Sequence, residues 1–267
     1  MVFKRKAVIK RKAVYKKRVY KKRAPKASSS LVKTIKRVMQ KQEETKCSSY
    51  SNLNWFMSPK STSIDMNVQT LSPSSYVINQ GVGQGDRIGN KIATKRCILR
   101  LVAFPLPYNI TTNGTPIPQD IVIYFGKLKQ TLDSPTSTDF TQLYQAGNSS
   151  AAPVNSLIDL TKPINTDIFT VVKQIRFKLG YSVYAGTGVN VGNQSFSNND
   201  YKLNFVRNID ITKLMAKHYI FSDNTNPPVN SALFMWNQSV GANGTTAAAN
   251  VIPASCSYTI DYQYTDA

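Results

Sequence analysis

Large apolar and polar side chains alternate without interruption near the end of the chain, and this pattern constrains the fold more than any other. Cys256, Tyr258, Ile260, Tyr262 and Tyr264 alternate with Ser257, Thr259, Asp261, Gln263 and Thr265. Successive side chains of a β-strand point to opposite faces of its sheet, so five repeats of period two predict a half-buried antiparallel strand. Such a strand needs a sheet with one face in a core and the other in solvent.

Seven further segments favour strands, with clusters of Asn, Gly, Pro, Ser and Thr between them. They are SIDMNVQ, NKIATKRCILRLVAF, QDIVIYFGKL, DIFTVVKQIRFKLGYSV, YKLNFV, AKHYIFS and SALFMWNQS. The second segment places Cys97, Leu99 and Leu101 on one face, and the third is apolar on both faces. The fourth sets five apolar residues on one face, namely Phe169, Val171, Ile175, Phe177 and Leu179.

Eight strands with long connections, and no regular alternation of strand and helix, predict an all-β sandwich or barrel. We expect a single eight-stranded jelly-roll sandwich over residues 47–267, with one short helix at STDFTQLYQ. A Greek-key barrel is the alternative that the pattern leaves open.

The start of the chain has a different composition. Residues 1–41 hold 17 of the 34 Lys and Arg residues and none of the 14 acids, so residues 42–267 carry a net charge of only +3. A block of like charges stays solvated and extended unless a polyanion neutralises it. Residues 1–46 are therefore expected to form a basic arm that includes a short amphipathic helix. The arm is expected to be disordered up to about residue 27, and its expected partner is nucleic acid. An anionic membrane surface is the second choice of partner, but no apolar run is long enough to cross a bilayer, so no membrane insertion is expected.

Within this arm, basic residues are predicted to bind phosphate, and Tyr15 and Tyr20 to stack on unpaired bases. The predicted basic residues are Lys4, Arg5, Lys6, Lys10, Arg11, Lys12, Lys16, Lys17, Arg18, Lys21, Lys22, Arg23, Lys26, Lys33, Lys36, Arg37 and Lys41. The clusters at 10–12, 16–18 and 21–23 also fit a nuclear localisation signal.

The helix is expected in SLVKTIKRVMQKQEE, with Ser30 as its N-cap. Helical spacing places Leu31, Ile35, Val38 and Met39 on one face, with Val32 at its margin. Lys33, Lys36, Arg37 and Lys41 lie opposite. This helix could pack on its own domain, on a partner or on nucleic acid.

A catalytic constellation is not visible. The chain has one histidine, His218, and two glutamates, and its aspartates are scattered without a pair at acid–base or metal-ligand spacing. Cys47, Cys97 and Cys256 are too far apart for a metal knuckle and are expected to be buried free thiols. We therefore expect no catalytic residue, no metal ligand and no cofactor, and a protein that is not an enzyme.

A glycine-rich stretch, INQGVGQGDRIGNKI (Ile78–Ile92), is the one place where a phosphate loop could occur. Its glycines are Gly81, Gly83, Gly85 and Gly89. No Gly-Lys-Ser/Thr follows, and Asp86 stands where the dinucleotide fingerprint needs a glycine. A strand, rather than a helix N-terminus, comes next. The stretch is therefore predicted to be a tight structural loop in which some glycines have positive φ.

This loop and its neighbours resemble a known protein family. Gln80, Gly81, Arg87, Ile88, Gly89 and Lys91 resemble the loop leading into strand C in capsid proteins of small circular, replication-initiator-encoding single-stranded DNA viruses, the circovirus-like group. PTSTDFTQLYQ, LIDLTKPINTDIFTVVKQIRFKL and CSYTIDYQYTDA are similar to that family's loop helix, following strand and closing strand. The chain departs from the family at Gly126, where an aspartate often follows the strand.

The resemblance implies a jelly-roll coat protein that self-assembles into a small icosahedral shell of 60 copies (T=1) around single-stranded DNA. Sixty arms with 17 basic residues each would neutralise on the order of 1,000 nucleotides at one phosphate per charge. The implied locations are the virion and, before assembly, the host nucleus, reached with an import receptor as partner.

Three other functions remain open. The chain could be the coat protein of a small or satellite RNA virus, which also combines a basic arm with a jelly roll. A monomeric, non-viral nuclear nucleic-acid-binding protein would share the same arm. A β-sandwich hydrolase with a basic tail has the least support, because the acids and histidines that it needs are missing.

Overall fold

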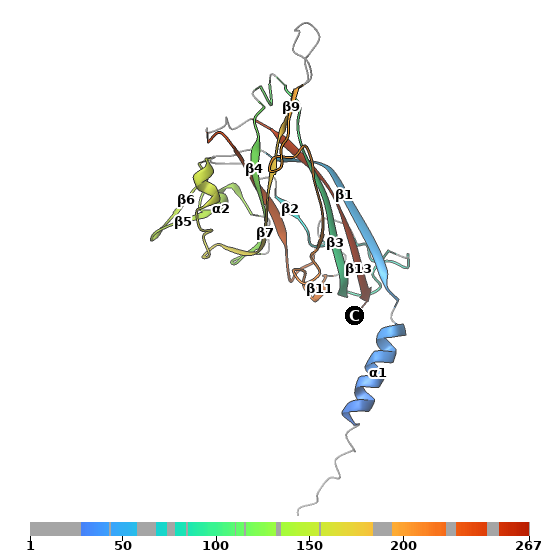
Figure 1. Cartoon of the computed structure of the whole chain (residues 1–267). Coiled ribbons are helices and arrows are strands. Elements are labelled where there is room, and N and C mark those ends of the chain that lie inside the picture. The colour runs from blue at the N-terminus through green and yellow to red at the C-terminus, as the bar shows by residue number, and fades with distance from the viewer. Residues whose placement is uncertain are drawn as a thin grey trace, which may run out of the picture. The chain divides into compact units, whose positions relative to one another are not determined.

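The computed structural model divides the chain into two compact units, Met1–Gln42 and Glu43–Ala267. It describes residues 28–42, 44–57, 68–73, 78–83, 85–109, 111–114, 116–131, 135–154, 156–183, 194–222, 228–244 and 251–266. The described part of the first unit is helix α1 (Ser29–Gln42), labelled in Figure 1. The N-cap is Ser28 rather than the predicted Ser30, because the Ser28 hydroxyl accepts a hydrogen bond from the Leu31 N–H at 3.2 Å.

The second unit contains two antiparallel sheets (Figure 1). Sheet A has the order β1 (Lys46–Met57), β13 (Ala254–Asp266), β3 (Lys91–Pro105), β10 (Phe205–Asp210), and β11 (His218–Ile220) also pairs with β3. Sheet B has the order β2 (Gln69–Thr70), β12 (Phe234–Gly241), β4 (Gln119–Leu128), β7 (Phe169–Leu179).

These orders define the fold. With the eight principal strands counted along the chain, the sheets run 1-8-3-6 and 2-7-4-5. This is the connectivity of a jelly roll, in which two Greek keys fold into a two-sheet sandwich. The predicted all-β jelly roll is therefore confirmed, and the barrel alternative is wrong.

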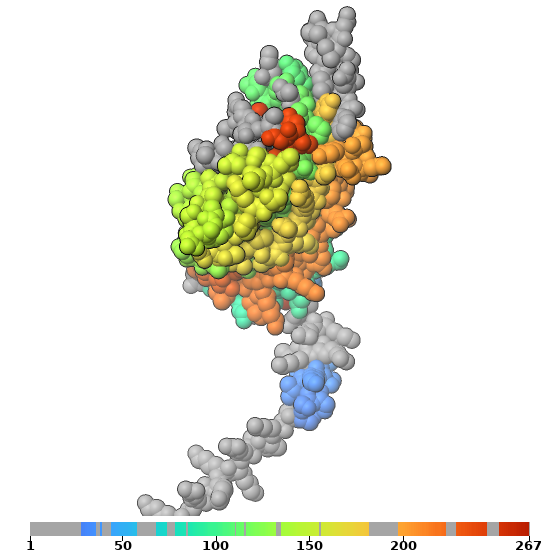
Figure 2. Space-filling view, turned by 60° about the vertical axis from the view of Figure 1, so that its left-hand side comes forward, coloured from blue at the N-terminus to red at the C-terminus, as the bar shows by residue number. Residues whose placement is uncertain are grey.

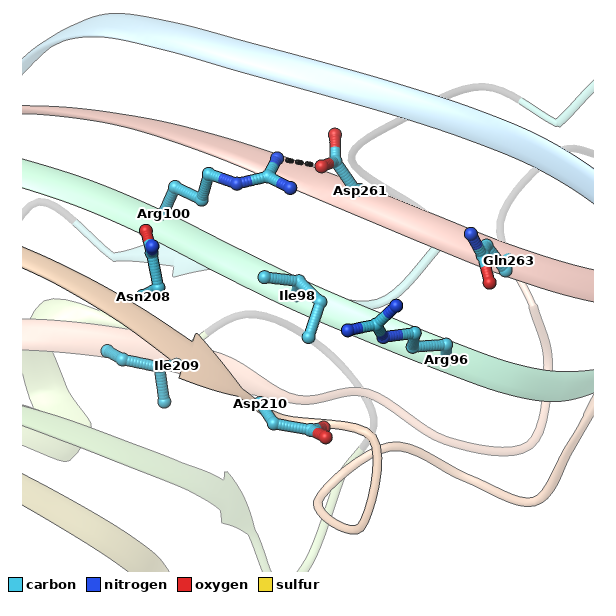
Figure 3. Close-up of a pocket in the computed structure, with 8 residues that line it drawn as sticks. All are labelled: Arg96, Ile98, Arg100, Asn208, Ile209, Asp210, Asp261 and Gln263. Carbon is cyan, nitrogen blue, oxygen red and sulfur yellow. Dashed lines mark hydrogen bonds and ion pairs between the residues drawn. The ribbon is translucent and has the colours of Figure 1, made fainter.

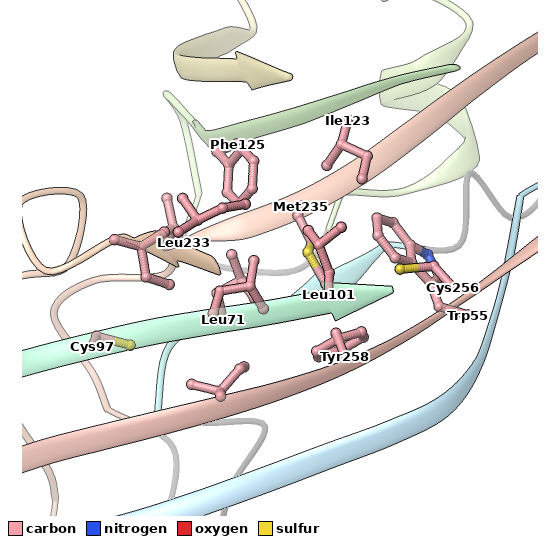
Figure 4. Packing of buried hydrophobic residues seen from close by; sticks show 14 of the residues in the cluster. Trp55, Leu71, Cys97, Leu101, Ile123, Phe125, Leu233, Met235, Cys256 and Tyr258 are labelled. Carbon is pink, nitrogen blue, oxygen red and sulfur yellow. The ribbon is translucent and has the colours of Figure 1, made fainter. Parts of the chain in front are cut away.

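A hydrophobic core fills the space between the sheets (Figure 4). The five apolar residues of the closing strand β13 are all at most 3% exposed, which confirms the alternation predicted for Cys256–Tyr264. The opposite sheet contributes Ile121, Ile123 and Phe125 from β4. Cys97, Leu99 and Leu101 of β3 are also buried in this core, as predicted.

A second cluster lies on the outer face of sheet B. It joins Val122 and Tyr124 of β4 and Trp236 of β12 to residues of the segment 129–168, which connects β4 to β7. This insertion contains α2 (Ser137–Phe140), β5 (Tyr144–Ala146), β6 (Ser149–Ala151) and the 3-10 helix η1 (Leu157–Leu160). It forms the yellow-green surface layer in Figure 2. Because β4 lies between the core and this layer, both of its faces are apolar.

The predicted helix at STDFTQLYQ is present but only four residues long. Thr136 and Asp139 form a reciprocal capping box at its start. A two-stranded sheet of β8 (Tyr181–Val183) and β9 (Gln194–Phe196) completes the described elements.

Several strand assignments need correction. The first strand, β1, was not predicted, because its Ser- and Asn-rich sequence KCSSYSNLNWFM has few of the residues that favour strands. The segment SIDMNVQ lies almost entirely outside the described residues. Only Phe205 and Val206 of YKLNFV are in β10, and AKHYIFS supplies β11, a short addition to β3 rather than one of the eight principal strands.

The predicted single face of β7 is also wrong. Ile175, Phe177 and Leu179 pack on the core between the sheets, but Phe169 and Val171 pack on the outer cluster. The register shifts between Phe125 and Gly126 of β4, so β7 contains one extra residue and its alternation changes phase.

The three cysteines are free thiols, as predicted, but they are not all buried. Cys97 and Cys256 are buried, whereas Cys47 is exposed. Burial raises the pKa of the Cys256 thiol to about 12.

Candidate nucleic-acid interface

The residues predicted to bind nucleic acid fall into two groups. Lys4 through Lys26, with Tyr15 and Tyr20, lie outside the described residues. Lys33 lies in α1 and is exposed, and positions 36, 37 and 41 belong to the same helix. Their role in binding nucleic acid stays a prediction.

The glycine-rich loop folds back on itself around Asp86. The Gly81 N–H donates to the Arg87 carbonyl at 3.0 Å, and the Gly83 N–H donates to Oδ2 of Asp86 at 3.0 Å. The loop leads directly into β3. The eight strands of a jelly roll are lettered B to I in chain order. Since β3 is the third principal strand, it is strand D, and the expectation that this loop precedes strand C is wrong.

The reason for glycine in this loop also differs from the prediction. Gly81, Gly83, Gly85 and Gly89 do not have positive φ; among the described glycines, only Gly147 and Gly244 do. Instead, a Cβ atom at Gly81 or Gly83 would lie 2.6 Å from Oδ2 of Asp86. Two of the four glycines therefore let the backbone approach the carboxylate closely.

Arg87 is almost fully buried, at 1% exposure, beneath this loop. Its Nη1 donates to the Gly89 carbonyl at 2.8 Å and to Oδ1 of Asn90 at 3.0 Å, and its guanidinium carbon lies 4.5 Å from the centre of the Phe221 ring. A guanidinium engaged in this way fits a structural role for Arg87 within the loop predicted at Ile78–Ile92, and its burial keeps it away from a phosphate. That role remains a prediction.

The loop is attached to the two strand ends where the second unit begins and ends. Lys46, the first residue of β1, donates to the Asp86 carbonyl at 2.6 Å and forms an ion pair with Asp266 at 2.9 Å. The Tyr264 hydroxyl donates to the Gly85 carbonyl at 2.7 Å. Burial raises the pKa of this hydroxyl to about 12, so it remains a donor at neutral pH. These contacts fix the start of β1, and they involve Lys46, a residue that the sequence had assigned to the arm.

The outer face of sheet A holds a hollow lined by both basic and acidic side chains. This hollow of about 360 Å³ lies over β3, β10 and β13 and is lined by Arg96, Ile98, Arg100, Asn208, Ile209, Asp210, Asp261 and Gln263 (Figure 3). Arg96 and Arg100 alternate along β3 with the buried Cys97, Leu99 and Leu101, and the sequence had not proposed them as ligands for nucleic acid.

The charges in this hollow cancel. Arg100 forms an ion pair with Asp261 across β3 and β13, as Figure 3 shows. Arg96 helps to lower the pKa of Asp210, after the larger effect of hydrogen bonds from Thr212. Two arginines thus face two aspartates, and a phosphate would have to displace Asp261 from Arg100. The body therefore has no concentration of unopposed positive charge in this hollow.

Within the described residues, no three His, Cys, Asp or Glu side chains gather closely enough to hold a metal ion. No helix in the described part of the chain combines the length and the apolar character needed to cross a bilayer.

Comparisons with known proteins add one structural likeness. No family model and no curated protein matches the chain. Among solved structures, the chain is similar to the cryo-EM structure of Mud crab tombus-like virus, with 15% sequence identity over 84% of this chain and 90% of the other, at a TM-score of 0.31. A likeness at this level shows no function for this chain.

Proposed function

We propose that this protein is a viral coat protein that assembles into a small icosahedral shell and packages single-stranded nucleic acid through its basic arm. The observation that carries the proposal is that most of the net positive charge lies outside the folded jelly-roll body. A jelly-roll body with a net charge of +3 follows a segment that contains 17 basic residues and no acid within its first 41 residues.

This separation suits a packaging protein for a physical reason. Residues 1–41 repel one another unless a polyanion neutralises them, and single-stranded nucleic acid supplies one negative charge per nucleotide. The body has no comparable net charge to compete for phosphate, since residues 42–267 together carry only +3. In a shell of 60 copies, the arms would neutralise about 1,000 nucleotides, which is enough for a very small genome.

We propose DNA as the cargo, on the resemblance of the glycine-rich loop and its neighbours to circovirus-like coat proteins. An RNA cargo would use the same arm chemistry, because counterion release at phosphates does not distinguish the two. Digesting the nucleic acid extracted from purified particles with DNase or RNase distinguishes them directly.

We also propose that the clusters at 10–12, 16–18 and 21–23 direct the protein to the nucleus before assembly. A fluorescent fusion of the full chain should accumulate in nuclei. Replacing the nine basic residues of these clusters with glutamine should abolish that accumulation.

The central test compares full-length protein with a variant that lacks residues 2–27. Full-length protein should form closed particles with a high ratio of absorbance at 260 nm to that at 280 nm. The deletion should leave the thermal transition of the body nearly unchanged and lower the absorbance ratio sharply. Packaging should also weaken as salt rises during assembly, because the arm releases counterions from phosphate. The logarithm of the binding constant should fall with the logarithm of the salt concentration, with a slope of about −0.7 per phosphate neutralised on a single strand.

Two results would contradict the proposal. Truncated particles with a full load of nucleic acid would show that the body, not the arm, packages it. A protein that stays monomeric in sedimentation experiments across a wide range of salt and pH would favour a non-viral nuclear nucleic-acid-binding protein.

A further inference from the structure

Helix α1 exposes a continuous apolar face. Leu31 is 52% exposed, Val32 39%, Ile35 49% and Val38 48%. These positions follow the spacing i, i+1, i+4, i+7, so they lie on one side of a helix with 3.6 residues per turn. Four branched apolar side chains on one side of a 14-residue helix favour a partner that offers them an apolar environment.

The rest of α1 is basic. The helix contains four Lys or Arg residues and no acid, and helical geometry places positions 33, 36, 37 and 41 away from the apolar face. No acidic residue precedes Glu43 anywhere in the chain. A partner for α1 therefore has to supply apolar surface on one side and negative charge on the other.

Most candidate partners satisfy only one of these requirements. A nucleic-acid backbone supplies phosphate but leaves the apolar face in water. A second copy of α1 supplies an apolar face, but each copy brings the same 17 positive charges, which repel one another. An anionic lipid bilayer supplies both, because its acyl chains lie directly beneath a layer of negative headgroups.

We infer that α1 binds in the plane of anionic lipid bilayers, with Leu31, Val32, Ile35 and Val38 at the boundary between headgroups and acyl chains. The helix is about 21 Å long at 1.5 Å per residue, which is too short to cross a hydrocarbon core of about 30 Å. It has the features of a helix that lies in the interface: one apolar face, one Lys- and Arg-rich face and low overall hydrophobicity. This membrane activity would be a second function beside packaging. Lipid headgroups and nucleic acid would compete for the basic residues of the helix.

The test uses full-length protein and vesicles that contain a trapped dye, made of phosphatidylcholine with or without phosphatidylserine. The basic arm alone should attach the protein to anionic vesicles at low salt and release it at high salt. The apolar face adds binding that survives high salt and disturbs the bilayer. Wild-type protein should therefore stay bound at high salt and release dye from the anionic vesicles only.

The decisive variant replaces Ile35 and Val38 with glutamine, which keeps the charge and favours helix. Binding at high salt and dye release should each fall about tenfold, given the apolar area removed. Thr34→Gln is the matched control, because it makes the same kind of change at a polar position of the same helix, and it should behave as wild type.

Three outcomes would overturn the inference. The double variant could release dye as wild type does, which would mean that the charge of the arm, and not the apolar face, disturbs the bilayer. Its thermal transition could fall, which would show that the apolar face packs within the protein. Wild-type protein could associate through this face without lipid, which would make a second copy the partner. Because the variant keeps residues 1–27, its packaged nucleic acid should be unchanged, so this test and that of the proposed function can fail separately.

Discussion

The two outer faces of the sandwich differ although the sheets that form them are similar in size. The outer face of sheet B lies beneath the insertion 129–168, and the aromatic rings of Tyr124, Phe140, Phe169 and Trp236 are stacked or tilted against one another there. The outer face of sheet A carries no such layer among the described residues, and its side chains include the exposed pair Arg100 and Asp261. One face is a second core, and the other is a solvent surface.

This difference is visible in the strands themselves. In β4, the first eight residues are all buried, whereas β13 alternates between buried and partly exposed residues over most of its length. A strand with two apolar faces needs two layers of cover, and a strand with one needs a single layer. The comparison therefore shows that the insertion is part of the folded body rather than a surface loop added to it, and the following predictions test this.

The largest effect is expected at the centre of the covered face. Trp236 is fully buried and contacts Tyr124, Phe140 and Phe169. Trp236→Ala should lower the free energy of unfolding by about 3–5 kcal/mol, because it removes a large ring and leaves a cavity. Phe56→Ala, at a 39% exposed aromatic residue of β1, is the comparison on sheet A and should cost much less. Urea denaturation of both variants measures the difference, and equal losses would mean that the two faces are not distinct.

The next effect concerns the polar anchor of the insertion. Asp159 is fully buried and accepts hydrogen bonds from the Val154 N–H at 2.7 Å, from Gln238 at 3.0 Å and from Lys162 at 2.9 Å. Asp159→Asn removes the negative partner of Lys162 and should cost about 3 kcal/mol. Asp261→Asn, at an exposed carboxylate of sheet A, is the matched control and should cost less than about 1 kcal/mol. Hydrogen exchange should show that the loss is largest within residues 135–168; a uniform loss would contradict the role of Asp159 as a local anchor.

The covered and bare faces also explain which features the sequence could predict. The strand β13 was predicted correctly because its alternation depends only on the chain's own residues and on one buried face. The two apolar faces of β4 were recognised, but their cause was not, since the insertion that covers them has no strong periodicity of its own.

Other features depend on contacts between distant segments. The change of phase in β7 arises from its pairing with β4, and nothing within DIFTVVKQIRFKL marks the extra residue. The attachment of Lys46 to Asp86 and Asp266 joins three separate segments. The basic arm is the opposite case, because its predicted role depends on charge density alone and requires no folded geometry.

The third prediction concerns Gly126, where the backbone of β4 lies close to Trp236 in the outer cluster. Gly126, where the chain departs from the family pattern, lies within β4. A Cβ atom there would lie 2.7 Å from Cη2 of Trp236 and 2.8 Å from the Thr170 carbonyl oxygen. Gly126→Ala should therefore cost about 1–3 kcal/mol through overpacking. At Gly89, the nearest atom to an added Cβ would be the Lys91 nitrogen at 4.0 Å, so Gly89→Ala should be nearly neutral in the same urea experiment. A stable Gly126→Ala variant would mean that Trp236 can move, and hence that the outer cluster is loosely packed.

The fourth prediction uses pH. Burial, reinforced by Tyr124 and Asp159, raises the pKa of the Tyr144 phenol above its usual value. Above about pH 10 the unfolded chain loses this proton while the folded chain keeps it, so stability should fall as pH rises, by about 1.4 kcal/mol per pH unit for this one group. Tyr144→Phe should remove that share of the pH dependence. Urea denaturation from pH 9 to 11, compared between wild type and variant, measures it; identical slopes would show that Tyr144 ionises in the folded protein and that the covered face is open to solvent.

The smallest effect is expected on the bare face. The Arg100 side chain is 51% exposed and that of Asp261 36% exposed, so water and salt screen their ion pair. Arg100→Gln should lower the free energy of unfolding of the unassembled protein by less than about 1 kcal/mol, and the loss should shrink further at high salt. Because the hollow around Arg100 is neutral in formal charge, the variant should also package as much nucleic acid as wild type, measured by the ratio of absorbance at 260 nm to that at 280 nm. A large loss of packaged nucleic acid would contradict this and would assign part of the packaging to the outer face of sheet A, since only the release of Arg100 from Asp261 could make it available to a phosphate.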